Sequence, residues 1–322
     1  MPLLIGLHAL KQEVIDRMPL RRIGGGWALD GGGNARGTNA VDLQTTRAAA
    51  TQVASGNGSF IGGGYYNTAS GLRSVIVGGG SNIVTGIDSA IFFGQGNSIV
   101  SNQSVIVGGL SNYISTAVSF IGMGNYNQIT AYGGGGFIGA GNSNQITNQY
   151  GFIGSGQNNA VDAPYASVIS ALQAKANKRG QTVKSSFMFA AQGDAQGSLL
   201  TAGCKTTNNT PEELFLDGDG GSARMTIASD TTWAFHILVT ARRTDADNES
   251  AAYDFIGCID NNAGTTALVG SVTKTVVAED TAAWDCNVTA DNTNDALIIT
   301  ATGENSKTIQ WVAFIQLVET TG

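Results

Sequence analysis

Residues 59–88 read SFIGGGYYNTASGLR followed by SVIVGGGSNIVTGID, two copies of a 15-residue unit that continues to about residue 165. Seven copies align on an Asn, with a Gly three residues before it and an Ile six residues before it. The spacing between copies is fifteen residues except for one of seventeen, where the stretch Tyr132–Gly135 holds extra glycines. A fixed short period of this kind is the signature of a repeat architecture, in which each unit packs only on its neighbours. The aligned Asn residues are Asn67, Asn82, Asn97, Asn112, Asn127, Asn144 and Asn159.

The unit is too short for a pair of helices, and it is rich in Val, Ile, Phe and Gly. We therefore interpret each copy as two short strands joined by turns, which is one coil of a β-solenoid. The recurrent Gly is expected to supply a turn conformation with positive φ, which Asn also tolerates. The fold class predicted for the whole chain is all-β.

Two apolar columns are predicted to form the solenoid core. One is the Ile column, and the other lies two residues after each Asn. Stacked coils bring the residues of each column into a ladder. The predicted core Ile residues are Ile61, Ile76, Ile91, Ile106, Ile121, Ile138 and Ile153.

The residue before each core Ile forms a third apolar column, called here the outward column. Neighbouring residues of a strand point to opposite faces, so this column faces away from the core. A continuous apolar stripe needs a cover. We favour an identical neighbouring chain over a helix or loop of the same chain. The column is Phe60, Val75, Ala90, Val105, Phe120, Phe137 and Phe152, and all of these except Ala90 are predicted interface residues.

Four segments are distinguished along the chain. Residues 1–58 are expected to attach the protein to a larger assembly, and an amphipathic pattern predicts a short helix over 3–18 that serves as this anchor or as a cap on the first coil. Residues 59–165 form the repeat shaft. Residues 166–180 lose the Gly and Asn of the repeat and are predicted to be a linker or cap. Residues 181–322 show about eight strands of period two, typical of a jelly-roll-like antiparallel β-sandwich.

Composition excludes several classes of function. Only 13% of the 322 residues are charged, and the net charge is −7, which argues against binding to duplex nucleic acid or insertion into a membrane. The two His and three widely spaced Cys are too few for a zinc site, so no metal and no cofactor are predicted. No basic N-terminal region typical of a signal peptide is found.

A search for catalytic groups finds none, and the protein is predicted not to be an enzyme. The shaft lacks paired carboxylates, and His236 is expected to be structural. The run from Asp217 to Gly221 resembles half of a calcium loop, but we favour a tight turn. Tyr253 and Trp284 are the candidates for stacking on a sugar ring, with burial in the core as the commoner alternative. The residues that bind a ligand are otherwise unknown.

The repeats resemble those of trimeric autotransporter adhesin heads, as in Ser74–Gly78 (SVIVG) and Ser104–Gly108 (SVIVG). The resemblance covers residues 59–165 and implies a homotrimer. Similar repeats occur in tail fibres of tailed bacteriophages. The lead-in segments Gly33–Gln44 and Ala50–Gly56 look like those of phage tail proteins, particularly of cyanobacterial phages. The departures from the adhesins are the missing secretion signal, coiled-coil stalk and membrane anchor.

This resemblance implies a phage tail fibre or receptor-binding protein, located in the virion and assembled in the host cytoplasm. Its partners would be its own copies, a baseplate or tail protein bound through the N-terminus, and a host-surface glycan or protein bound through the C-terminal domain. The alternatives are a glycan depolymerase tailspike, a purely structural baseplate component and, last, a bacterial adhesin.

Overall fold

The computed structural model describes residues 20–29, 32–246 and 248–322, and these residues form strands and turns without any helix. The helix expected over residues 3–18 lies outside the described residues. The chain divides into two compact units, Met1–Asn144 and Gln145–Gly322. Repeat coils occur in both units, about 10 turns in total, and antiparallel strands follow them in the second unit. The predicted all-β solenoid is therefore confirmed.

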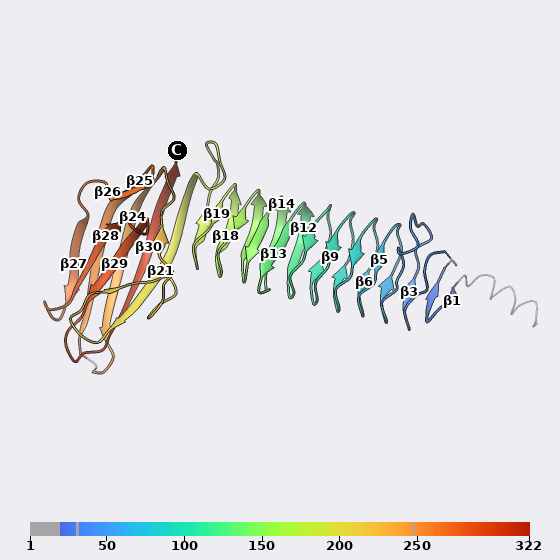
Figure 1. The fold of residues 1–322 in the computed structure, drawn as a ribbon, viewed down its shortest axis with the longest axis horizontal. Helices are drawn as coiled ribbons and strands as arrows, with labels where there is room; N and C mark the ends of the chain where they lie inside the picture. The colour runs from blue at the N-terminus through green and yellow to red at the C-terminus, as the bar shows by residue number, and fades with distance from the viewer. Residues whose placement is uncertain (1–19, 30–31, 247) are drawn as a thin grey trace, which may run out of the picture. The chain divides into compact units, whose positions relative to one another are not determined.

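In the first unit, each coil contributes one strand to each of two parallel ladders (Figure 1). Strands pair in register with their equivalents one coil later, for example Phe60 with Val75 and Ile61 with Ile76. A hairpin of β1 (Arg21–Ile23) and β2 (Gly26–Ala28) precedes the coils. The first ladder contains β3 (Val41–Asp42), β4 (Phe60–Ile61), β6 (Val75–Ile76), β8 (Ala90–Ile91), β10 (Val105–Ile106), β12 (Phe120–Asn125) and β14 (Phe137–Asn142). The second contains β5 (Thr68–Ala69), β7 (Ile83–Val84), β9 (Ser98–Ile99), β11 (Tyr113–Ile114) and β13 (Gln128–Tyr132).

The recurrent Gly has the positive φ that the repeat predicts. Gly109, for example, has a φ of 105°. A Cβ placed on Gly109 would lie 1.8 Å from the carbonyl oxygen of Gly124 in the next coil. Glycine is therefore required twice over, by its backbone conformation and by the close approach of the neighbouring coil.

The recurrent Asn has a different role from the one expected. The left-handed conformation falls on the residue before it, as in Ser81 and Ser111. The Asn side chains are buried and bridge successive coils. The Asn82 Nδ2 group donates to the carbonyl oxygen of Gly94 at 3.0 Å, and its Oδ1 atom accepts from the backbone amide of Asn97 at 3.0 Å. The Asn column therefore holds adjacent coils together inside the solenoid.

A buried ion cluster lies at β3, near the N-terminal end of the first ladder. Asp42 pairs in register with Ile61, so a carboxylate occupies the position of a core Ile. Both Arg36 Nε and Arg47 Nη2 donate to Asp42 Oδ2 at 3.0 Å, and the Asp42 and Arg36 side chains are fully buried. Gln44 does for the first repeat what each recurrent Asn does for the next coil. Its Oε1 atom accepts a hydrogen bond from the backbone amide of Asn67 at 2.9 Å.

In the second unit the coils continue beyond the end of the recognisable repeat. The segment 166–180, expected to be a linker or cap, instead forms coils. Val168, Ala174, Ala176 and Val183 fill the core there. Asn159 Oδ1 accepts from the amide of Ala174 at 2.9 Å. The strands are β15 (Gln145–Asn148), β16 (Phe152–Gln157), β17 (Ala160–Val161), β18 (Ser167–Leu172), β19 (Lys175–Ala176) and β20 (Thr182–Lys184).

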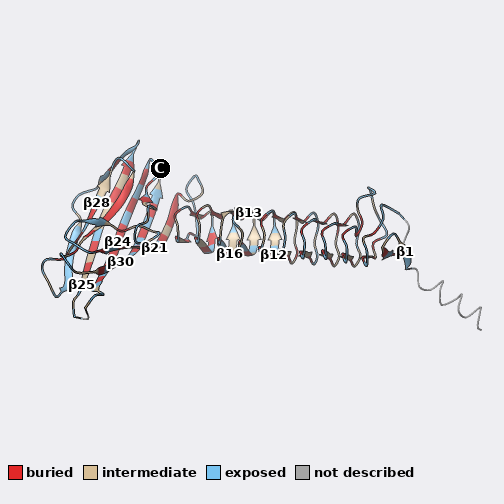
Figure 2. Ribbon diagram, turned by 60° about the horizontal axis from the view of Figure 1, so that its bottom comes forward, coloured by how far each residue is buried: buried red, intermediate tan, exposed pale blue. Residues whose placement is uncertain are grey.

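Two antiparallel sheets follow and enclose one apolar core that includes Trp233, Trp284 and Trp311. Long strands of the larger sheet alternate between buried and exposed residues, as Figure 2 shows for β24 and β30. The larger sheet contains β21 (Ala195–Thr206), β30 (Ile309–Thr321), β24 (Thr231–Arg243), β25 (Ser250–Asn262), β26 (Thr265–Leu268) and β27 (Thr273–Glu279). The smaller sheet contains β22 (Glu212–Glu213), β23 (Met225–Thr226), β28 (Asp285–Asp291) and β29 (Ala296–Thr302).

Candidate binding site

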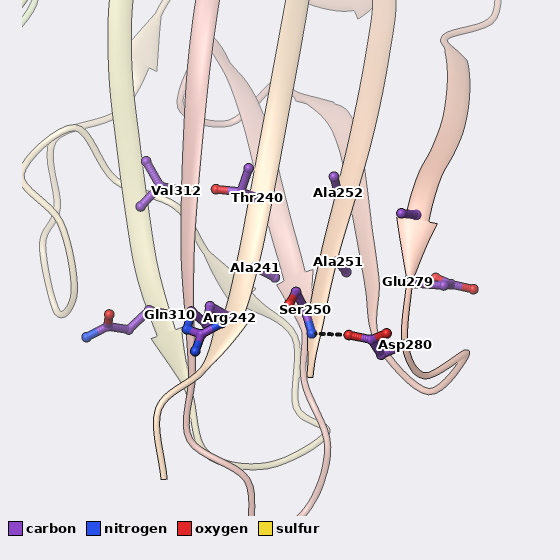
Figure 3. Close-up of a pocket in the computed structure, with 11 residues that line it drawn as sticks. Thr240, Ala241, Arg242, Ser250, Ala251, Ala252, Glu279, Asp280, Gln310 and Val312 are labelled. Carbon is purple, nitrogen blue, oxygen red and sulfur yellow. Dashed lines mark hydrogen bonds between the residues drawn. The ribbon is translucent and has the colours of Figure 1, made fainter. Parts of the chain in front are cut away.

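A pocket of about 680 Å³ opens at one end of the larger sheet. Strands β24, β25, β27 and β30 form it, together with Asp280, which follows β27. In Figure 3 Gln310 and Arg242 lie on one side, and Glu279 and Asp280 lie on the other. The apolar lining is Ala241, Ala251, Ala252, Ala278 and Val312, and the polar lining is Thr240, Arg242, Ser250, Glu279, Asp280 and Gln310.

A β-bulge shapes the acidic side of the pocket. Tyr253 pairs with Val276 and Ala252 with Ala278, which leaves Val277 as an extra residue of β27. Bulges bend a strand and change the direction of its side chains. Beyond this bulge, Glu279 Oε2 accepts a hydrogen bond from the hydroxyl of Tyr253 at 3.2 Å. Asp280 Oδ2 accepts from the backbone amide of Ser250 at 2.7 Å (Figure 3).

An ion-pair network lies one residue beyond Arg242. The guanidinium of Arg243 contacts Asp245 and Glu249, and Lys307 contacts Glu249 and Glu304. The hydrogen bond from Arg243 lowers the pKa of Asp245 to about 2. Lys307 and Arg243 similarly lower the pKa of Glu249. These pairs connect the end of β24 with the segments that precede β25 and β30.

The pocket suits a small polar ligand with apolar patches. Its volume falls in the usual range for small-molecule sites, and its alanine floor leaves room for a ring. Hydroxyl, amide, guanidinium and carboxylate groups offer both hydrogen-bond donors and acceptors around that floor. A sugar, whose ring carries hydroxyl groups and C–H surfaces, has this chemistry.

The two aromatic candidates for sugar binding are buried. Tyr253 is 0% exposed and Trp284 is 1% exposed, and both belong to the apolar core. Neither ring is accessible to a ligand, which agrees with the commoner alternative of burial in the core. Burial and the neighbouring Glu279 carboxylate raise the pKa of Tyr253. The pocket residues themselves were missed because they come from four strands that are far apart in the sequence, and only the fold brings them together.

The other residues considered for chemistry have structural partners. Asp217 Oδ1 accepts from the amides of Ser222 and Ala223 at 3.0 and 2.9 Å, which is the geometry of a turn. His236 Nε2 lies 2.7 Å from Asp254 Oδ1 on the exposed side of the larger sheet. Within the described parts of the chain, no group of three or more His, Cys, Asp or Glu side chains is placed to hold a metal ion. The same residues contain no helix that is long and apolar enough to cross a membrane.

The outward column lies on the solenoid surface. Its members in the first unit are half-buried, except that Phe137 is 37% exposed. The rings of Phe120 and Phe137 stack at 5.1 Å between centroids. Phe152, in the second unit, is 40% exposed. The seven predicted core Ile residues are all 0% exposed.

No protein-family model matches the chain, and no curated protein matches it in sequence. Solved structures that it resembles are phage tailspike proteins. The tailspike gp49 of Acinetobacter baumannii bacteriophage Fri1, described as a capsular polysaccharide depolymerase, is 7% identical with a TM-score of 0.25, and the match covers 88% of this chain and 67% of that one. The tailspike of Acinetobacter phage vB_ApiP_P1 is 8% identical with a TM-score of 0.21, and the match covers 87% of this chain and 58% of that one. The tailspike of Acinetobacter baumannii phage AM24 is 6% identical with a TM-score of 0.23, and the match covers 87% of this chain and 67% of that one.

These comparisons bear on one prediction. The expectation that the protein is not an enzyme is contradicted, because the Fri1 tailspike is described as a depolymerase. That expectation is withdrawn, and the structure itself shows a β-solenoid followed by antiparallel strands.

Proposed function

We propose that the protein is a tail fibre or tailspike of a tailed bacteriophage that binds a host-surface glycan through its C-terminal domain. In this proposal, residues 1–58 attach to a baseplate or tail protein, residues 59–165 act as a spacer, and residues 181–322 carry the receptor site. Three copies would present three sites, so that weak individual contacts add up to firm attachment.

The pocket between β24, β25, β27 and β30 is the observation that carries this proposal. It combines an alanine floor with Arg242, Gln310, Glu279 and Asp280 at its edge. The repeats between residues 59 and 165 offer no comparable set, since Arg73, Asp88 and Asp162 are their charged residues. Arg73 and Asp88 pair with each other. A site that recognises a polar saccharide is therefore better placed in the sandwich than on the coils.

The test is binding of the full chain to an array of bacterial surface polysaccharides. Removing a charged hydrogen-bonding group from a site costs about 1.5–3 kcal/mol, so Arg242→Ala should weaken binding at least about tenfold. Arg224→Ala is the matched control, because Arg224 pairs with Glu213 at 2.7 Å in the same domain and does not line the pocket. Equal binding by both variants and the unchanged protein would reject the pocket as the receptor site.

A depolymerase is the second candidate, favoured by the two carboxylates of Glu279 and Asp280 in one pocket. Glycan hydrolysis uses a pair of carboxyl groups, one as the acid and one as the base or nucleophile. New reducing ends should appear when the protein is incubated with a polysaccharide that it binds. Glu279→Gln and Asp280→Asn should each abolish them while binding persists. Binding without new reducing ends would leave glycan attachment as the function.

A further inference from the structure

A second, smaller pocket lies within the second unit, where the coil of β19 meets the sandwich. Its volume is about 180 Å³, and its walls come from that coil, from the segment before β21 and from β24 and β30. Thr231 at the start of β24 lines it, whereas Arg242 near the end of β24 lines the first pocket. The strand between these two residues is about 35 Å long. The second pocket is therefore a separate site.

Lys178 places a buried ammonium group at this pocket. Its side chain belongs to a residue that is 6% exposed, and Nζ lies 4.8 Å from the centroid of the Trp233 ring, where the face of the ring attracts a cation. Nζ donates one hydrogen bond, to Asn177 Oδ1 at 2.9 Å, and it forms no ion pair with any described residue. An ammonium group has three N–H donors, so Lys178 keeps donor capacity for a ligand.

Glu319 supplies an acceptor to the same pocket. The residue is 5% exposed, and its Oε1 atom accepts hydrogen bonds from the side chains of Gln181, Gln196 and Ser198. In the described parts of the chain its Oε2 atom has no donor, although it is not sealed from solvent. A buried carboxylate oxygen without a hydrogen bond is unfavourable, so Oε2 is a ready acceptor for an N–H or O–H group.

The other charges of the pocket already have partners. Asp194 accepts hydrogen bonds from the backbone amides of residues 189–191. Lys175 Nζ lies 3.7 Å from a carboxylate oxygen of Asp162. One cation and one anion are left for a ligand, and their charges cancel. The pocket therefore suits a neutral group that has an acceptor and a donor, rather than a carboxylate or an amine.

The size and the apolar walls of the pocket narrow this choice. Ligand pockets usually measure about 300–1,000 Å³, so a pocket of about 180 Å³ accepts a substituent rather than a whole oligosaccharide. Ala191, Ala228 and the ring of Trp233 form apolar parts of its wall. An acetamido group combines a carbonyl acceptor, an N–H donor and a methyl group. A sugar hydroxyl has the donor and the acceptor but no apolar part.

We propose that the second pocket binds the acetamido group of an N-acetylated amino sugar. The carbonyl oxygen accepts from Lys178 Nζ, the N–H group donates to Glu319 Oε2, and the methyl group packs on Trp233 and the two alanines. The inference rests on the proposed function in taking a host-surface glycan as the ligand, and it narrows that glycan to one that contains N-acetylated sugars. Because the two pockets lie at opposite ends of β24, each can be tested without the other.

Nuclear magnetic resonance of the full chain, with its tryptophans labelled with ¹⁵N, tests the assignment. Trp233 and Trp284 both have a buried Nε1 atom without an acceptor among the described residues, but Trp284 does not line the pocket. The probes are methyl N-acetylglucosaminide and methyl glucoside, which differ by the acetamido group. The first should shift the indole signal of Trp233 and leave that of Trp284 in place, and the second should shift neither. Trp233→Phe and Trp284→Phe assign the two signals.

A variant pair tests the role of the ammonium group. Lys178→Met keeps the length of the side chain and removes the donor, so it should weaken binding of methyl N-acetylglucosaminide at least about tenfold. Lys184→Met is the matched control, because Lys184 is exposed and does not line the pocket. Equal affinities of the two variants would contradict the role of Lys178. Melting temperatures show whether both variants are folded, and the titration of the unchanged protein decides the question if Lys178→Met is not.

Two further outcomes would overturn the proposal. Equal shifts of the Trp233 signal with both sugars would show that the pocket does not select the acetamido group. No shift with either sugar would show that no sugar substituent enters it. In both cases, polysaccharide binding on the array that is weakened by Arg242→Ala would leave the proposed function intact. A Trp233 shift specific for the N-acetylated sugar, without any binding on the array, would instead reject the proposed function and retain the pocket.

Discussion

The side-chain oxygen of Asn97 accepts hydrogen bonds from both the backbone amide and the side-chain amide of Asn112, each at 3.0 Å. Asn112 repeats this arrangement toward Asn127 in the following coil, again at 3.0 Å. The column is thus a chain of amides inside the solenoid, in which each member satisfies a backbone donor of the next coil. Buried polar groups of this kind are costly to leave unpaired.

Replacing Asn112 by Ala should destabilise the solenoid by about 3 kcal/mol, because several buried backbone groups lose their partners at about 1–3 kcal/mol each. The lost bonds include those from Nδ2 to the carbonyl oxygens of Gly108 and Gly124. Asn102→Ala is the control, since the side chain of exposed Asn102 accepts one hydrogen bond, from the amide of Ile87, and its backbone bonds survive the substitution. The loss of stability in each of the two variants would be measured by thermal unfolding and by hydrogen exchange of residues 97–127. Similar losses for the two variants would contradict a special role for the buried column.

Two adjacent glycines should respond very differently to substitution by Ala. At Gly109 the φ of 105° and the approach of Gly124 O oppose any side chain. At Gly108 the nearest atom to an added Cβ is Phe93 O at 3.7 Å, an ordinary contact. Strained backbone alone costs about 1–3 kcal/mol, so Gly109→Ala should lower the unfolding temperature sharply and Gly108→Ala only slightly. Equal melting temperatures would show that the coil spacing adapts to a Cβ.

The carboxylate of Asp42 should be essential for the stability of the first coils. Asp42→Asn keeps the shape but removes the charge that both Arg36 and Arg47 contact. Breaking a buried pair in this way costs about 3–5 kcal/mol. Hydrogen exchange of residues 41–61 should rise, whereas Asp88→Asn should have little effect, because its pair with Arg73 is exposed. Unchanged protection at residues 41–61 in Asp42→Asn would contradict this role.

The repeat made most of the solenoid predictable. Ile76 and Gly79 recur at a fixed period, and each has one physical reason, burial or positive φ, that a sequence reveals directly. The coils around Val168 and Ala174 were not predictable, because small apolar residues replace the recurrent Ile and Asn there. These coils are positioned by pairing with the strands of the preceding coil, and their own sequence shows no repeat.

The candidate site was much less predictable. Arg242 and Asp280 are 38 positions apart and become neighbours of one pocket only through the pairing of β24, β25 and β27. Tyr253 was a candidate sugar ligand because its ring is aromatic. Buried and exposed residues alternate along β25, however, and Tyr253 is one of the buried ones. Sequence periodicity indicates which residues share a face, but it does not determine which strand edges meet.

The pair between Arg243 and Asp245 should contribute a distinct pH dependence. Arg243 Nε lies 2.9 Å from Asp245 Oδ1, and this bond lowers the pKa of Asp245 to about 2. In the unfolded chain the pKa of an Asp side chain is about 3.9. A lowered pKa in the folded state means that the contribution to stability is complete above about pH 4 and is lost as the pH falls through about 2.

The measurement is the difference in melting temperature between the unchanged protein and Asp245→Asn, followed from pH 7 to pH 2. The difference should be constant down to about pH 4 and should shrink toward zero near pH 2. In an Arg243→Gln background the same substitution should show a much smaller change over that range, because the donor that lowers the pKa is gone. A difference that stays flat from pH 7 to pH 2 in the original background would mean that Asp245 gains no stabilisation from Arg243.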